Sequence, residues 1–218
     1  MGQDWVRWHE RYDDAASSLA RRLSVVQREV RRALAEAPGD GELRLASMCA
    51  GEGRDVLPVL AARDLPAHGG TRPVRAVLVE LNPTLASRAR ATAVDLGLGG
   101  VDVVTGDAGV TDPYLAVAPA HVILACGVFG NVTIDDVVRT VETLPSLLAP
   151  GGIVIWTRGR GEDPGDDPAL AVRDCFTGNG FAELAYISPE DDPYRVGTHR
   201  LRAPATPPRA GIRMFSFV

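Results

Sequence analysis

Three short segments of the chain hold residues that could bind a nucleoside. The first contains Gly51 and Gly53, the second contains Glu80, and the third contains Asp107 followed by Ala108. Glycines let a backbone approach a ligand closely. Glu80 could accept hydrogen bonds from both hydroxyls of a ribose, and Asp107 could accept one from the amine of adenine while a backbone N–H serves a ring nitrogen. Each segment taken alone could equally be a turn or a helix cap.

The elements expected around these segments place them along one edge of a sheet. Apolar runs predict strands, and periodic patterns predict helices between them. The strands are expected over residues 43–49, 75–79, 101–105, 121–126 and 152–157, and the helices over 55–62, 83–96 and 134–148. This alternation predicts crossover units and a mostly parallel sheet with helices on both faces. Ligands bind beyond the carboxyl ends of such strands, so we expect the three segments to form one nucleoside-binding strip.

The two ends of the chain differ from this alternating centre. An apolar stripe predicts an amphipathic helix over residues 15–37, and the arginines beside it are interpreted as a solvated face. Near the other end we expect a helix over 168–177, a strand over 182–187, an extended segment over 195–201 and a last strand over 213–218. No helix separates these last stretches, so they should return antiparallel.

Composition excludes several kinds of function. The chain has 218 residues with 23 basic and 28 acidic side chains, a formal net charge of −5, which argues against a nucleic-acid partner. Every basic residue is arginine, and the missing lysine excludes Schiff-base chemistry and a P-loop. The three cysteines and four histidines lack the spacing of metal ligands, so no metal is expected. We recognise no signal peptide and no membrane-spanning run, and we expect a cytoplasmic protein.

Five stretches resemble motifs of the class I S-adenosyl-L-methionine (SAM)-dependent methyltransferases: LRLASMCAGEGRD, AVLVELNP, VVTGDA, HVILACGVFGNV and LLAPGGIVIWT. The resemblance implies an α/β, Rossmann-like, seven-stranded and mostly parallel sheet with an antiparallel C-terminal strand. It also implies SAM as cofactor and S-adenosyl-L-homocysteine as product. The implied cofactor-binding residues are Ala50, Gly51 and Gly53 at the methionine part, Glu80 at the ribose with Leu81 beside it, Asp107 and Ala108 at the adenine, and Cys126 and Gly127 at the sulfonium.

The chain departs from the family pattern in its first motif. Ser47 stands where the family usually has an acid, and Cys49 stands where it has a first glycine. The gap of 27 residues between Gly53 and Glu80 is also longer than usual, which a loop at residues 66–70 would explain. These departures concern the methionine end of the site more than the nucleoside end.

The segments outside the motifs suggest how an acceptor could be held. Residues 1–40 are expected to form a helical lid or cap, and residues 41–218 the SAM-binding domain. Tyr12, Asn131 and Arg158 are candidate acceptor contacts, and Arg158 could instead pair with Glu162 or Asp163 at the surface. The acceptor is expected to be a small molecule. No catalytic residue is assigned, although His9 and His199 are candidates for a general base, and the oligomeric state stays open.

Two other functions remain open from the sequence. An NAD-dependent oxidoreductase would share the glycine turn and the ribose acid, but its G-x-G-x-x-G motif would need glycine where Val56 stands. A non-catalytic SAM-binding domain is the second alternative, because of Ser47 and Cys49. Binding of SAM or of NAD would separate the first alternative, and turnover would separate the second.

Overall fold

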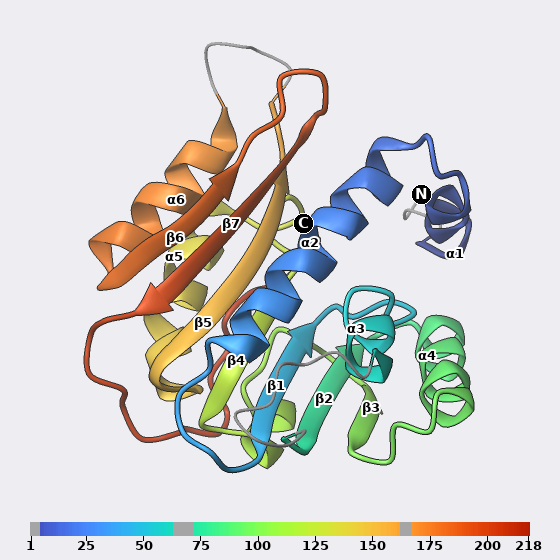
Figure 1. Ribbon diagram of the computed structural model, residues 1–218. Helices are drawn as coiled ribbons and strands as arrows, with labels where there is room; N and C mark the ends of the chain where they lie inside the picture. Colours follow the sequence, from blue (N-terminus) through green and yellow to red (C-terminus); the bar gives the residue numbers. More distant parts are fainter. Residues whose placement is uncertain (1–4, 63–71, 162–166) are drawn as a thin grey trace.

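The computed structural model describes residues 5–62, 72–161 and 167–218. Its centre is a seven-stranded sheet with the order β3-β2-β1-β4-β5-β7-β6 (Figure 1). The strands are β1 (Leu43–Met48), β2 (Val74–Glu80), β3 (Val101–Thr105), β4 (Ala120–Ala125), β5 (Leu148–Gly159), β6 (Phe181–Ile187) and β7 (Tyr194–Leu201). The first five strands are mutually parallel, and β7 is antiparallel to both β5 and β6. The predicted fold class is therefore confirmed.

Helices cover both faces of this sheet (Figure 1). On one face lie α2 (Ser18–Ala35), α3 (Leu57–Ala61) and α4 (Pro83–Asp95), and on the other lie α5 (Ile134–Thr143) and α6 (Pro168–Gly178). Successive strand residues point to opposite faces. Leu45 of β1 is accordingly buried with residues of α2 and α4, and Ala46 is buried with residues of α5 and α6. Burial on both sides explains why β1 is a continuous apolar run in the sequence.

Caps fix the start of the helices that follow the strands. The Asn82 side chain accepts hydrogen bonds from the N–H groups of Thr84 and Leu85, and Pro83 lies in the first turn of α4. Thr133 caps α5 in a similar way. Because Asn82 follows Glu80 by two residues, its cap holds the beginning of α4 directly beside the carboxyl end of β2.

The predicted strand at residues 213–218 is wrong. Only an isolated antiparallel bridge joins Arg213 to Val110 in this described segment, and the antiparallel strand is β7 instead. The tail crosses the carboxyl edge of the sheet, where Met214 N–H donates to the Gly109 carbonyl and Val218 N–H donates to the Asn131 carbonyl. Its backbone groups therefore pair with the loops after β3 and β4 rather than with a sheet edge.

Two boundaries also differ from the sequence prediction. The helix expected over 134–148 ends at Thr143, a 3₁₀ turn containing Pro145 follows, and β5 already begins at Leu148. The first long helix begins at Ser18 because the Ser17 hydroxyl caps it. The loop expected at residues 66–70 lies outside the described residues. None of the helices in the described part of the chain is both long and apolar enough to cross a membrane.

Candidate functional site

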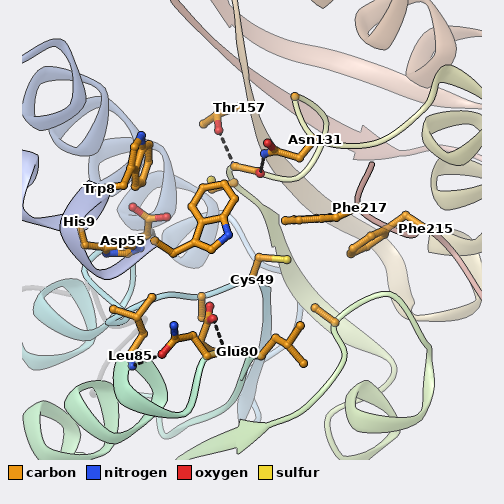
Figure 2. A pocket seen from close by; sticks show the side chains of 18 of the residues that line it. Trp8, His9, Cys49, Asp55, Glu80, Leu85, Asn131, Thr157, Phe215 and Phe217 are labelled. Carbon is orange, nitrogen blue, oxygen red and sulfur yellow. Dashed lines mark hydrogen bonds between the residues drawn. The ribbon is translucent and has the colours of Figure 1, made fainter. Parts of the chain in front are cut away.

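A cavity of about 770 Å³ lies at the carboxyl ends of the strands (Figure 2). It is lined by residues at or just after the carboxyl ends of the strands from β1 to β5, by the segment before α2 and by the C-terminal tail. Of the residues predicted to contact cofactor or acceptor, most line it: Tyr12, Ala50, Glu80, Leu81, Asp107, Ala108, Cys126, Gly127, Asn131 and Arg158. Parallel strands thus bring together residues that are far apart in the sequence.

The loop after β1 turns through an unusual backbone conformation. Cys49 has a φ of 50°, in the left-handed region that favours glycine, so the position where the family pattern has glycine keeps that conformation with a side chain. Gly51 N–H donates to Oε2 of Glu80 at 2.8 Å, and a Cβ on Gly51 would lie 2.2 Å from Cε1 of His9. Neither Gly51 nor Gly53 lines the cavity. Direct contact of either glycine with a ligand stays a prediction.

Glu80 holds two loops with its two carboxylate oxygens. Oε2 accepts the N–H of Gly51, and Oε1 accepts the N–H of Asn82 at 2.8 Å. The residue is 8% exposed and lines the cavity. Hydrogen bonds from backbone N–H groups keep this carboxylate in one orientation, and each oxygen retains a lone pair for a further donor.

Asp107 already has partners in the structure. Its Oδ1 accepts the N–H of Gly109 at 2.7 Å, and its Oδ2 accepts from Nη1 of Arg213 at 2.5 Å. Burial alone would raise the pKa of Asp107, but the hydrogen bonds from Arg213 and Gly109 outweigh it and lower the pKa. The carboxylate is therefore ionised and is an acceptor at neutral pH.

The ends of β4 and β5 form another part of the wall. Gly127 N–H donates to the Thr157 hydroxyl at 2.9 Å, and the Asn131 amide donates to the Gly127 carbonyl at 2.8 Å (Figure 2). Arg158 follows Thr157, and its Nε atom is buried without a hydrogen-bond partner. Burial lowers the pKa of Arg158, and the charge of Asp167 counteracts this. Glu162 and Asp163, its predicted surface partners, lie outside the described residues.

Aromatic side chains of the N-terminal segment line the cavity beside these polar groups. The segment comprises α1 (Trp5–His9) and a 3₁₀ turn, and it places Trp5, Trp8, His9 and Tyr12 there. The Tyr12 hydroxyl accepts from Nη2 of Arg22 at 2.8 Å, and burial raises the pKa of Tyr12. Burial lowers the pKa of His9. His199, the other candidate base, is buried against Trp156 in the sheet and does not line the cavity.

The sequence reasoning missed four charged residues that line the cavity: Arg22, Arg54, Asp55 and Arg213. Arg22 was interpreted as part of a solvated face, yet it lies three residues after Leu19 and four before Val26, on the apolar stripe. Burial raises the pKa of Asp55, and the charge of Arg22 and a hydrogen bond with the Cys126 thiol counteract only part of this rise. No group of three or more His, Cys, Asp or Glu that could hold a metal occurs within residues 5–62, 72–161 and 167–218.

No family model matches the chain, and no curated protein matches it. Solved structures do match it. Magnesium protoporphyrin IX methyltransferase from Synechocystis PCC 6803 with bound SAM is 14% identical at a TM-score of 0.63, over 92% of this chain and 92% of that chain. An O-methyltransferase family protein from Burkholderia thailandensis is 15% identical (TM-score 0.65; 88% and 58%). An rRNA methylase from Streptococcus thermophilus is 14% identical (TM-score 0.58; 80% and 95%). The chain has the fold of the class I SAM-dependent methyltransferases.

Proposed function

We propose that this protein is a SAM-dependent methyltransferase that methylates a small molecule and releases S-adenosyl-L-homocysteine. One observation carries the proposal: Ala50, Glu80, Asp107 and Cys126 lie at the carboxyl ends of four different strands and line one cavity. The cavity volume of about 770 Å³ lies within the range of small-molecule sites. The SAM bound to one fold neighbour supports the same cofactor here.

The half of the cavity formed after β1, β2 and β3 fits a nucleoside. Glu80, already oriented by two backbone N–H groups, would accept the ribose hydroxyls, with Leu81 beside it. Asp107 would accept from the adenine amine, and the backbone of Ala108 would serve a ring nitrogen. NAD also contains an adenosine, but the G-x-G-x-x-G motif of an NAD-binding turn would need glycine where Val56 stands.

The methionine part of SAM would lie between the loops after β1 and β4. Ala50, Cys126 and Gly127 line this region, and Gly51 and Gly53 give the first loop its course. The Cys126 thiol would be neutral there, because burial raises its pKa well above the ordinary value. A neutral thiol is a poor nucleophile, so Cys126 would not compete with an acceptor for the methyl group.

The chain would contribute to transfer mainly by alignment. When bound, SAM supplies a methyl group on a sulfonium, and the acceptor atom forms its bond to that carbon as the C–S bond breaks and its electron pair goes to sulfur. Holding two reactants in line is worth an effective molarity of about 10⁵ M or more. Of the N-terminal residues expected to form a lid, Trp8 and Tyr12 line the cavity and would exclude water from the site. His9 lines the cavity, but no step is assigned to it.

Calorimetric titration with SAM, S-adenosyl-L-homocysteine and NAD tests the proposal. We expect both sulfur nucleosides to bind one site per chain and NAD to bind far more weakly. Tight NAD binding would favour the oxidoreductase instead. Transfer of radiolabel from SAM into ribosomal RNA, in preference to a metabolite extract, would refute the small-molecule acceptor. Binding without transfer to any acceptor would indicate a non-catalytic SAM-binding domain. The cytoplasmic location stays a prediction.

A further inference from the structure

Arg158 stands out among the arginines that line the cavity because it has no hydrogen-bond or ion-pair partner in the described part of the chain. The residue is half-buried, and its Nε atom is fully buried and makes no hydrogen bond. A guanidinium has five N–H donors and stays charged, so burying one of these donors without an acceptor is unfavourable. Such a group is satisfied when a ligand supplies the acceptors.

The carboxylate whose charge acts on Arg158 already has other hydrogen-bond partners. Asp167 is the carboxylate that raises the pKa of Arg158, but its Oδ2 accepts from Nε of Arg195 at 2.7 Å. Its Oδ1 caps α6 by accepting the N–H of Ala169 at 3.0 Å. Asp167 therefore balances Arg195 and the helix start, and it leaves Arg158 available to an anion in the cavity.

The other arginines that line the cavity are satisfied. Arg22 donates to the Tyr12 hydroxyl, Arg54 pairs with Asp13 and Glu52, and Arg213 pairs with Asp107. Arginine in general is common at cavities, so charge alone would not single out one residue. Within the described residues, it is the lack of a hydrogen-bond or ion-pair partner that distinguishes Arg158 from these three arginines.

The place of Arg158 in the sheet separates it from the nucleoside half. β5 lies beyond β4, whereas the proposed ribose and adenine contacts follow β2 and β3 on the other side of β1. The ribose and adenine would therefore lie away from Arg158, and weaker binding of S-adenosyl-L-homocysteine to Arg158→Gln would assign this arginine to the carboxylate of the methionine part instead of to the acceptor. This step rests on the function proposed above.

Apolar ring surfaces line the same cavity. Trp5, Trp8, Phe215 and Phe217 are among its lining residues, and the N–H of Val218 donates to the Asn131 carbonyl, which brings the end of the tail to the loop after β4. Figure 2 shows Trp8 and Phe217 on opposite sides of Cys49. Aromatic side chains favour flat partners through offset stacking and edge contacts. A flat apolar body therefore suits a cavity that is lined by these rings and by Arg158.

We propose that the methyl acceptor is an aromatic molecule that carries a carboxylate, and that Arg158 binds this carboxylate. A planar carboxylate can accept two parallel N–H bonds from a guanidinium, which sets direction as well as affinity. This contact would point the ring of the acceptor toward the aromatic side chains that line the cavity. Arg158 is thus the specificity-determining residue of the acceptor half, and the nucleoside half does not depend on it.

The test uses 4-hydroxybenzoate and its neutral counterpart 4-hydroxybenzamide as probes, titrated into the full chain saturated with S-adenosyl-L-homocysteine. We expect the carboxylate to bind at least about tenfold more tightly than the amide. Arg158→Gln should remove that preference, and Arg158→Lys should restore part of it because lysine keeps the charge without the planar fork. Arg160→Gln is the matched control, since Arg160 is exposed and does not line the cavity.

The outcomes separate this inference from the proposed function. Failure of S-adenosyl-L-homocysteine to bind would refute the proposed function, and the acceptor assignment with it. Normal binding of that nucleoside with equal affinity for both probes, or with neither probe bound, would overturn the acceptor assignment alone. A lower melting temperature of Arg158→Gln with an unchanged preference for the carboxylate would also overturn it, because Arg158 would then serve as a structural ion-pair partner. Unchanged nucleoside affinity in Arg158→Gln is expected throughout.

Discussion

Replacing Glu80 by glutamine should lower both the stability of the protein and its affinity for SAM. The carboxylate accepts N–H groups from Gly51 and Asn82, each at 2.8 Å, and the residue is 8% exposed. Glutamine keeps one acceptor oxygen, but its amide group would face the other N–H, donor against donor. Hydrogen bonds to charged groups contribute about 1.5–3 kcal/mol each, so we expect the free energy of unfolding to fall by about 2–3 kcal/mol.

That loss corresponds to a melting temperature lower by about 4–12 °C for a chain of this size. Scanning calorimetry without ligand measures it. The exposed Glu42, just before β1, provides the control, and Glu42→Gln should leave the melting temperature nearly unchanged. An unaltered melting temperature in Glu80→Gln would mean that these two loops do not depend on the carboxylate.

The effect on binding is a separate measurement. Loss of one charged acceptor for a ribose hydroxyl should weaken SAM binding about 10- to 100-fold, measured by isothermal titration below the melting transition. A destabilised Glu80→Gln variant that binds SAM as tightly as the wild type would refute the ribose assignment, while the structural role of Glu80 would stand.

Three further predictions concern other parts of the molecule. Asp107→Ala should weaken SAM binding about tenfold or more in calorimetry, whereas Asp102→Ala, at an exposed position of β3, should leave it unchanged. Equal SAM affinities of the two variants would contradict the adenine assignment. Gly197→Ala should lower the free energy of unfolding by about 1–3 kcal/mol in urea, because its Cβ would lie 2.2 Å from Cε2 of buried Trp156. Burial lowers the pKa of His199 to about 4. As the pH falls, the unfolded chain therefore binds a proton at this histidine before the folded chain does. The free energy of unfolding should accordingly fall by at most about 3 kcal/mol between pH 6.5 and 4. His199→Gln should remove this part of the pH dependence in urea titrations, and an unchanged slope would contradict the cause.

Local patterns were sufficient to place the strands and the residues that follow them. Buried strands such as β1 and β4 are continuous apolar runs, and the groups after them, including Cys126, lie at the cavity as expected. The course of the tail could not be predicted in this way. Its aromatic and β-branched content suits a strand, but β6 already pairs with the free edge of β7, so the tail bonds to loops instead.

Long-range pairing explains the other differences at the site. Arg213 meets Asp107 across 106 positions of sequence, and no local pattern contains that information. The bond from the Gly51 N–H to Glu80 joins residues 29 positions apart, and it too could not be predicted from local patterns. Arg22 is a different case, since its spacing from Leu19 and Val26 placed it on the buried stripe, and only its charge favoured the solvated interpretation.

The two carboxylates of the proposed nucleoside half differ in how firmly they are held. Glu80 is buried, and both of its partners are backbone N–H groups that a ligand need not displace. The pair between Asp107 and Arg213 has both side chains 48% exposed, and pairs of this kind contribute only about 0.2–1 kcal/mol. An adenine amine could donate to the second lone pair of the same carboxylate oxygen, beside Arg213 of the tail. Since Phe215 and Phe217 lie on that same tail, nucleoside binding and the shape of the acceptor half should be coupled, and the acceptor should bind more tightly after the nucleoside than before it.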